Sequence, residues 1–377
     1  MLLCQVRLLA LPLVWGLLPC WGSNGSRFSL AEQSVRARSE YAGAADRLQC
    51  ISFLPLGAQP MTVQTLPKQQ AGSVTQWLCN ALLSLCVATP LALQAAPEGV
   101  TQVDLGKAKV SMINDGVYAR PLDEKFVTNV PLEQVTQALR DVGLPDDRFD
   151  IPFNPLLVDI GKERVLIDTG HGEFGGPTMG LLLQRLQQAG VEPESVTTVL
   201  ITHFHGDHIN GLRNKAGELA FPNAKVMVPA GEWDWWMNDE RMAQTPEAGR
   251  GTFNAARRVF GPLADSVVKV QPGDEVVPGI RALDAAGHTP GHTAYMIDGG
   301  KRKLLYWADT TNIAIFVRNP DWSVQFDMDA EKARETRRRI ADLAIREKAL
   351  VGGFHLPGSA VGELKAKGSG YEFTPLK

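Results

Sequence analysis

From residue 110 onward, short apolar runs alternate with stretches of helical spacing. The runs predict buried strands at residues 110–113, 156–160, 165–168, 199–202 and 226–229, with a second set at 276–277, 280–283, 294–297 and 304–307. Apolar residues follow one another within the runs, as they do in strands buried on both faces. The pattern therefore predicts a mixed α/β chain.

Helical spacing is clearest at residues 178–189, where Leu182 and Leu186 recur on one face. A short helix is predicted at 255–260, and a longer one at 330–347. Acidic residues interleave a basic run on this last helix, which favours a solvent-exposed face. The basic residues are Arg334, Arg337, Arg338 and Arg339. No linker rich in Pro, Gly or Ser interrupts residues 97–377, so we expect one domain there.

The first 96 residues have a different pattern. They contain all five Cys, none of the seven His, and two apolar segments, at 1–22 and 77–92. The second segment follows Met61 and ends at small residues before Pro97, which is typical of a secretory signal peptide at 61–96. We therefore expect translation from Met61, with residues 1–60 an over-long gene start; the alternative is a genuine N-terminal anchor.

Export to the periplasm or the medium follows from that leader, with no stable membrane anchor on the mature chain. Residues 97–377 lack Cys, so neither a disulfide nor a thiolate ligand is expected there. The chain has 38 basic and 41 acidic residues, a formal net charge of −3, and the acidic excess is larger after residue 97. That balance argues against nucleic acid as a partner.

The richest stretch chemically is the strand-to-helix turn after residue 201. It reads H-x-H-x-D-H and contains His203, His205, Asp207 and His208. His203 and His205 are two residues apart, so their side chains can share one side of an extended segment. Imidazole and carboxylate groups are ligands of zinc, iron and manganese. The alternative is a polar turn with Asp207 as a helix cap, and the combined motif disfavours it.

Other potential ligands follow later apolar runs. His288 and His292 lie in G-H-T-P-G-H, Asp309 ends the run at 304–308, and His355 follows another run. Loops at strand ends are where rigid sheets carry their chemistry. We therefore expect these groups to meet the first motif.

The order of these motifs resembles that of the metallo-β-lactamase-fold hydrolases, and Asp168 in 165–170 matches the strand-D-T-G element of that fold. The resemblance covers about residues 105–375 and implies an αββα sandwich, an α/β fold with one catalytic domain. It also implies two metal positions. The first would be held by His203, His205 and His288, the second by Asp207, His208 and His355, and Asp309 would bridge them.

Further roles follow from the same resemblance. His292 and Asp168 would orient ligands from outside the metal centre, although Asp168 could equally cap a turn. His171 has no counterpart and is expected at the surface or the pocket rim. Zinc is the first expectation for the two divalent ions, with cobalt, manganese or iron also compatible.

Such a centre lowers the pKa of a bridging water, so that hydroxide can attack an ester. Asp207 and Asp309 are the expected catalytic carboxylates, and Asp207 could also relay a proton. Asp309 argues against the β-lactamases, which lack this bridge. The remaining chain resembles the secreted lactonase and methyl-parathion-hydrolase-like branch, in segments 153–158, 174–180, 221–224, 277–280 and 368–371.

In that branch aromatic side chains line the pocket, and the matching residues are Phe174, Trp236 and Phe253. Packing of a helix against the sheet is the alternative role for the Trp residues near 236. An aromatic pocket favours small, neutral, hydrophobic substrates. The predicted function is hydrolysis of lactones or aryl esters, with phosphotriesterase side activity.

Two alternatives stay open: a dedicated organophosphate hydrolase, and a non-catalytic metal-binding protein of the same fold. The filled ligand positions disfavour the second. The sequence leaves the oligomeric state open, a homodimer included.

Overall fold

The computed structural model describes residues 97–377. The predicted leader segments, 1–60 and 61–96, lie outside these residues and stay predictions. Within the described part, every helix is too short or too polar to cross a membrane.

Two seven-stranded sheets form the centre of the molecule. The first contains, in spatial order, β1 (Val100–Asp104), β2 (Ala108–Ile113), β5 (Leu156–Ile160), β6 (Glu163–Ile167), β7 (Thr198–Leu200), β8 (Lys225–Pro229) and β9 (Val268–Val270). The second contains β10 (Glu275–Val277), β11 (Ile280–Asp284), β12 (Thr293–Asp298), β13 (Lys303–Tyr306), β14 (Leu350–Gly352), β15 (Val361–Lys367) and β16 (Gly370–Pro375). A separate hairpin pairs β3 (Gly116–Pro121) with β4 (Arg148–Phe153).

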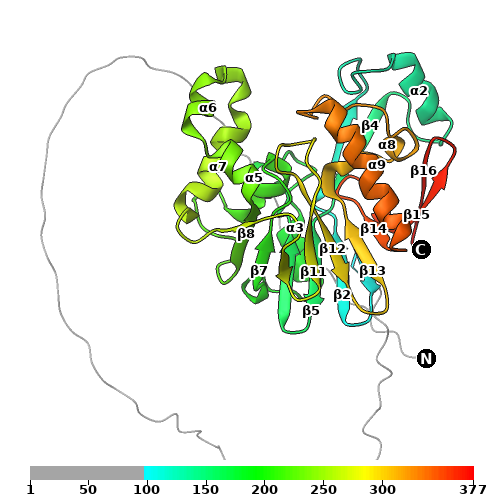
Figure 1. The fold of residues 1–377 in the computed structure, drawn as a ribbon. Coiled ribbons are helices and arrows are strands. Elements are labelled where there is room, and N and C mark those ends of the chain that lie inside the picture. The colour runs from blue at the N-terminus through cyan, green and yellow to red at the C-terminus, as the bar shows by residue number, and fades with distance from the viewer. Residues whose placement is uncertain (1–96) are drawn as a thin grey trace, which may run out of the picture. The chain divides into compact units, whose positions relative to one another are not determined.

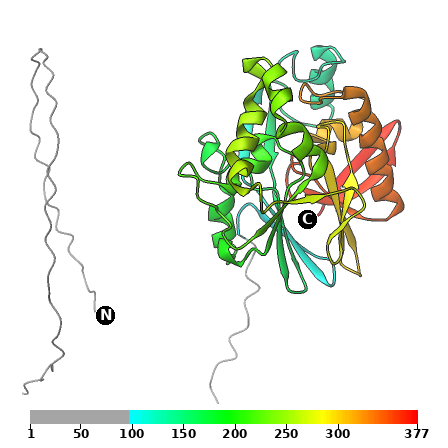
Figure 2. The ribbon, with the colours of Figure 1, turned by 60° about the vertical axis from the view of Figure 1, so that its left-hand side comes forward.

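Helices lie outside both sheets (Figures 1 and 2). The helices of the described residues are α2 (Leu132–Arg140), α3 (Leu182–Gln188), α4 (Gly206–Ile209), α5 (Ala230–Trp236), α6 (Asp239–Gln244), α7 (Gly251–Phe260), α8 (Ala314–Arg318) and α9 (Ala330–Arg346), and not all of them cover a sheet. Figures 1 and 2 show α5 and α7 outside the first sheet and α9 outside the second. The expected αββα sandwich is confirmed.

The continuous apolar runs are explained by burial on both faces of the first sheet. On β5, Leu156 and Val158 point into the core between the sheets, whereas Leu157 packs beneath the helices. β6 repeats the pattern: Val165 lies in the core between the sheets, and Leu166 packs beneath the helices. Because successive side chains point to opposite faces, a strand covered on both sides needs apolar residues throughout.

Two expectations for the helices need correction. The helix predicted from residue 178 begins at Leu182, because Gly180 has a φ of +83° and a loop occupies the preceding residues. Arg337, expected on a solvent-exposed face of α9, is 1% exposed. Its guanidinium donates to the carbonyl oxygens of Thr310, Pro320 and Trp322. The basic run is therefore split, since Arg338 and Arg339 remain at the surface.

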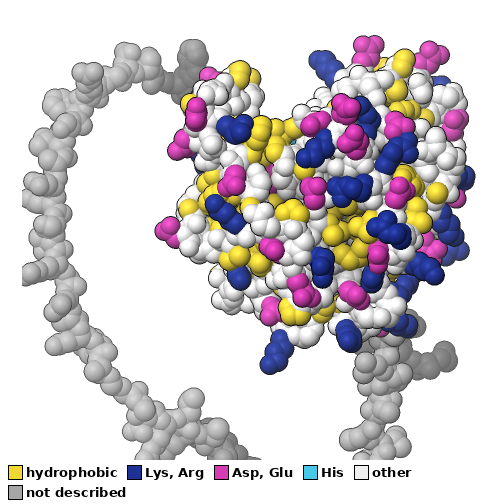
Figure 3. Space-filling view, viewed as in Figure 1, with side chains coloured by type: hydrophobic (Ala, Val, Ile, Leu, Met, Phe, Trp, Pro, Cys, Tyr) yellow, Lys and Arg dark blue, Asp and Glu magenta, His cyan; other side chains and the backbone are white. Residues whose placement is uncertain are grey.

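On the face drawn in Figure 3, basic and acidic side chains are interspersed. This face does not offer the continuous positive surface that a polyanion would need.

Candidate metal centre

The H-x-H-x-D-H motif forms the link between β7 and α4. His203 and His205 lie on the extended link, and Asp207 and His208 lie in the first turn of α4. Just after the motif, the backbone at Gly211 passes close to the backbone of Thr169. Only glycine fits there, because a Cβ on residue 211 would lie 1.8 Å from the carbonyl oxygen of Thr169. The loop is therefore packed directly against the strand-D-T-G segment.

The first predicted ligand group is assembled. The Nε2 atom of His203 and the Nε2 atom of His288 each lie 3.0 Å from Nδ1 of His205. His288 comes from the loop between β11 and β12 of the second sheet. The three ligand atoms lie within 4.8 Å of one another, a spacing that one metal ion could bridge.

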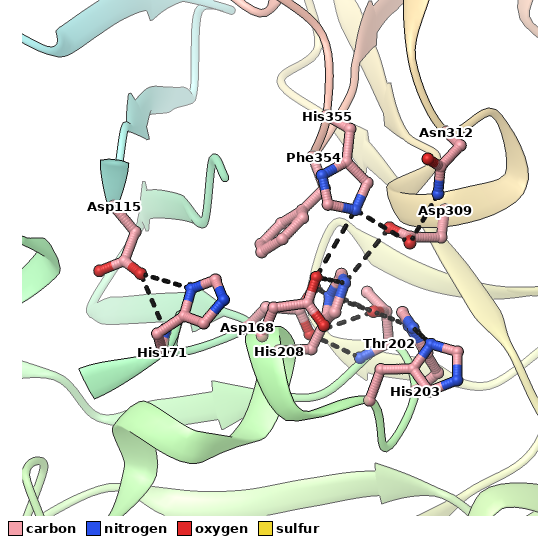
Figure 4. Close-up of polar contacts among 12 residues, drawn as sticks. Asp115, Asp168, His171, Thr202, His203, His208, Asp309, Asn312, Phe354 and His355 are labelled. Carbon is pink, nitrogen blue, oxygen red and sulfur yellow. Dashed lines mark hydrogen bonds and ion pairs between the residues drawn. The ribbon is translucent and has the colours of Figure 1, made fainter. Parts of the chain in front are cut away.

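The second group is assembled as well, as Figure 4 shows in part. An Oδ2 atom of Asp207 lies 3.5 Å from Nε2 of His208 and 3.6 Å from Nε2 of His355. His355 follows β14, so this group also draws on both sheets.

Asp309 lies between the groups. One carboxylate oxygen is 3.4 Å from Nε2 of His288 and 3.1 Å from Nε2 of His355. The other oxygen is 3.2 Å from Nε2 of His208. Asp309 thus contacts His residues of both groups, which suits the bridging role expected of it. Asn312 donates to the same side chain at 3.3 Å.

Partners outside the cluster orient the rings. Asp168, fully buried, lies 2.8 Å from Nδ1 of His208 and accepts the N–H of Thr202 (Figure 4). The structure therefore gives Asp168 the orienting position. His292 accepts the backbone N–H of Asp309 at 3.2 Å, so it holds the bridging residue and stands outside both ligand groups.

His171 lies to one side of the cluster. Its ring and backbone N–H contact the buried carboxylate of Asp115, as Figure 4 shows, and its ring packs edge-on against Phe153. Phe153 also contacts His355. His171 is largely buried, is not part of the cavity lining, and is separated from His355 by the ring of Phe153.

Burial determines the electrostatics of the first group. It lowers the pKa of His203 well below its ordinary value, and, with the help of neighbouring His288, it lowers the pKa of His205 to about 3. Both rings are therefore neutral, as metal ligands must be.

The second group is more strongly charged. Burial opposes ionisation of Asp309, but the imidazoles of His355 and His208 outweigh it and hold its pKa well below the usual range. The carboxylates in turn outweigh burial at His208 and raise its pKa. The carboxylates around His208 thus favour a positive charge at this position.

The residues fit a pair of metal ions. Within residues 97–377, the buried Nε2 of His208 and Oδ1 of Asp309 lie 3.2 Å apart, yet neither forms a hydrogen bond of good geometry with any group. A buried polar atom left unpaired costs about 1–3 kcal/mol, so such atoms call for a ligand. Neutral imidazoles and carboxylates are the donors that zinc and similar cations accept.

A cavity of about 370 Å³ opens onto these ligands. Its other lining residues come largely from the hairpin and from the loop before α9; they are Tyr118, Arg120, Ile151, Phe153, Gly206, Thr252, Asn312 and Phe326.

The predicted aromatic set is not part of that lining. Trp236 is 5% exposed and packs edge-on against Phe253, which is also buried, in the core beneath the first sheet. Phe174 instead stacks under the guanidinium of Arg258 at 3.8 Å. The structure thus assigns packing roles to Trp236 in α5 and Phe253 in α7, because both lie on helix faces that pack toward the first sheet.

Sequence reasoning missed several buried charged groups. Asp327 lies 2.9 Å from Nδ1 of His288, and Arg337 lies behind it at 3.5 Å. Glu232, fully buried at the start of α5, accepts backbone N–H groups from two ligand loops. Glu232 lies in a Trp-rich helix in which Asp234 is the other acidic residue, and this acidic position among Trp residues was an available signal. Asp327 lies in a loop whose sequence carries no comparable signal.

The geometry agrees with the comparisons to known proteins. The profile of the Metallo-beta-lactamase superfamily matches residues 152–350, so the chain belongs to that superfamily. An N-acyl homoserine lactonase from Bacillus sp. is 25% identical over 228 residues, covering 55% of this chain and 82% of that protein.

Two solved structures are similar over most of the described residues. AidC, a dizinc quorum-quenching lactonase in complex with a product, has a TM-score of 0.70 and 28% identity, covering 74% of this chain and 98% of its own. The hydrolase AbOPH of the beta lactamase superfamily has a TM-score of 0.69 and 27% identity with the same coverages. The chain is a metal-dependent, lactonase-like hydrolase.

Proposed function

We propose that this protein is an exported lactonase that opens N-acyl homoserine lactones and related hydrophobic lactones. The observation that carries the proposal is the cavity, which joins a complete His/Asp ligand set to an apolar aromatic wall. Similarity to lactonases in sequence and in structure supports the same substrate class.

The cavity wall suits an acyl lactone. Tyr118, Ile151, Phe153 and Phe326 offer apolar surface for an alkyl chain, and Tyr118 and Phe326 are 43% and 45% exposed at its mouth. Arg120 lines the cavity and adds one guanidinium. An N–H of this group could donate to the amide carbonyl of the substrate. The Arg120 guanidinium could pair with at most one ionised group of a substrate. A further ionised group would be buried without a partner, which costs several kcal/mol.

A bound pair of divalent metals supplies a water of lowered pKa and polarises the carbonyl oxygen. Seven side chains would hold it: His203, His205, Asp207, His208, His288, Asp309 and His355. Attack forms the bond between water oxygen and carbonyl carbon, and the ring C–O bond then breaks. The attacking water loses a proton, and the leaving alkoxide takes up a proton as the ring C–O bond breaks. Asp207 is 22% exposed against 3% for Asp309, so Asp207 is the carboxylate placed to pass that proton on.

The test is a substrate panel on the zinc-loaded protein: an acyl homoserine lactone, γ- and δ-lactones, an aryl ester, a phosphotriester and a cephalosporin. We expect lactones to have the highest kcat/KM, aryl esters and phosphotriesters lower values, and the cephalosporin no turnover. A phosphotriester with kcat/KM well above every lactone would replace the proposal by its alternative, an organophosphate hydrolase. No turnover of any substrate by the metal-loaded protein would favour a non-catalytic binding protein.

Export is proposed on the leader pattern alone. N-terminal sequencing of the protein from its native source should find a mature chain that begins near Pro97. A mature protein that retains residues before Met61 would contradict both the export signal and the start site.

A further inference from the structure

Glu232 is a buried carboxylate that contacts two loops of the metal centre, one from each sheet, and is not itself one of the expected metal ligands. It lies in the first turn of α5 and is 0% exposed. Its Oε2 accepts the backbone N–H of Phe204 at 2.9 Å, and its Oε1 accepts the backbone N–H of Gly291 at 2.7 Å. Each oxygen therefore serves a different loop.

The two loops are those that carry the first ligand group. Phe204 is the residue between His203 and His205, and Gly291 lies in the loop that presents His288. The first loop extends from β7 in one sheet, and the second joins β11 to β12 in the other. The Glu232 carboxylate thus connects two layers beside the position where their ligand atoms approach to 3.0 Å.

Packing around Glu232 keeps the second loop against α5. A Cβ on Gly291 would lie 2.2 Å from the backbone nitrogen of Glu232, and a Cβ on Gly231 would lie 2.9 Å from Cα of Gly291. The second glycine of G-H-T-P-G-H is therefore required by this contact with α5.

A carboxylate in this position has an energetic cost. Burial raises the pKa of Glu232, and the hydrogen bonds from the Thr289 side chain, the Phe204 and Gly291 amides and the Trp236 indole act against that rise. Among the described residues, no Lys or Arg side chain donates a hydrogen bond to Glu232. Each of the two loops directs one backbone N–H toward this position, and each N–H needs an acceptor. The two oxygens of one carboxylate supply both acceptors, which explains an acidic residue here.

We propose that Glu232 is a positioning residue for the first metal site: its two oxygens fix the spacing between the His203–His205 segment and the His288 loop. The inference rests on the proposed metal-dependent function, but it concerns metal affinity and is independent of the substrate. Outer partners of metal ligands typically contribute about 10–100-fold in affinity.

The test variant is Glu232→Gln, which keeps the shape but replaces one acceptor oxygen by an NH₂ group, so one loop loses its acceptor. Trp236→Phe is the matched control, because it removes an N–H donor to the same carboxylate and leaves both loop contacts. Full-length zinc-loaded proteins are titrated with a chelator, and metal content is followed by mass spectrometry under native conditions. His288→Ala and His355→Ala identify which release step belongs to which site.

We expect Glu232→Gln to weaken zinc at the His203–His205–His288 site by about 10–100-fold, with the second site and the Trp236→Phe protein near wild type. Equal weakening of both sites, or lowered stability with unchanged zinc affinities, would overturn the proposal. Should Glu232→Gln not fold, hydrogen exchange on the wild-type protein decides. Amides of Phe204 and Gly291 that stay protected after chelation support the proposal, and fast exchange of either contradicts it. Because no substrate is used, a wrong substrate class leaves this result intact.

Discussion

Trp236 shows that an aromatic residue near a site can belong to the core and lie outside the cavity lining. Its indole N–H donates to Glu232 at 2.8 Å and its ring packs on Phe253. The sequence offered both roles, because residues three or four apart on a short helix share a face and the buried face is fixed only by the tertiary structure. The cavity wall is instead supplied by Tyr118 and Phe326, which no motif marks.

Trp236→Ala should therefore reduce stability and leave substrate affinity unchanged. Loss of a buried Trp typically costs about 3–5 kcal/mol, with an additional contribution from the carboxylate left without its donor. Urea denaturation measures the loss, and kinetics at a temperature where the variant is folded should give a KM for lactones within about twofold of wild type. A raised KM in the folded variant would show that Trp236 contributes to substrate binding.

Arg120 should determine substrate affinity. Its guanidinium lines the cavity and pairs with Asp123 at 3.1 Å. A hydrogen bond from a charged group contributes about 1.5–3 kcal/mol, so Arg120→Met should raise KM for acyl homoserine lactones about tenfold or more, with a smaller change in kcat. Lactones without the amide should be affected less.

Arg148→Met is the matched control for Arg120. Arg148 lies on the same hairpin, is half exposed and pairs with Asp147 and Asp150 away from the cavity lining. Equal KM changes in both variants would show that hairpin stability, and not the Arg120 donor, is responsible.

At the level of elements, the buried strands and the motif loops could be predicted and the cavity wall could not. Continuous apolar runs predict the central strands, since a strand buried on both faces needs an apolar residue at nearly every position. The β3–β4 hairpin escaped prediction because it is exposed on one side and carries charged residues, with Arg120 and Arg148 among them. Ligands were predictable because metal chemistry restricts them to His and Asp.

The loop of G-H-T-P-G-H is held by a helix on each side. Beyond its contact with α5, it accepts the backbone N–H of Asp329 at the Gly287 carbonyl, next to the N-terminus of α9. Gly287 has a φ of +137°, and a Cβ there would lie 2.5 Å from the backbone nitrogen of Ala333. The glycine is therefore needed for conformation and for space.

Gly287→Ala should displace this loop from α9. Strain at such a backbone position costs about 1–3 kcal/mol before the clash is counted. We expect a lower melting temperature and weaker zinc binding at the His288 site, measured by calorimetry and chelator titration. Gly273→Ala is the control for positive φ alone, because Gly273 has a φ of +98° and open space around its Cβ. Similar zinc affinities in the two variants would rule out a specific role of the α9 contact.

At the level of the whole molecule, the metal centre joins two layers. His203, His205, Asp207 and His208 follow a strand of the first sheet, whereas His288, Asp309 and His355 follow strands of the second. The core between the sheets holds the layers together by apolar burial, and the ligands converge at its edge. Any ion bound there contacts both sheets and binds only the folded arrangement, so metal occupancy should contribute to global stability.

Removal of metal should therefore lower the melting temperature of the entire domain in one cooperative step. A ligand at about 1,000 times its Kd stabilises the folded state by about 4 kcal/mol, which for a domain of this size corresponds to a shift on the order of 10 °C. Calorimetry before and after chelation, with elemental analysis, should show that shift and two zinc ions per loaded chain. Asp309→Ala should bind fewer ions and lose most of the shift, because both sites lose the bridging carboxylate. A loaded wild-type chain with one ion or none, or a melting temperature unchanged by chelation, would contradict a two-metal centre that spans the sheets.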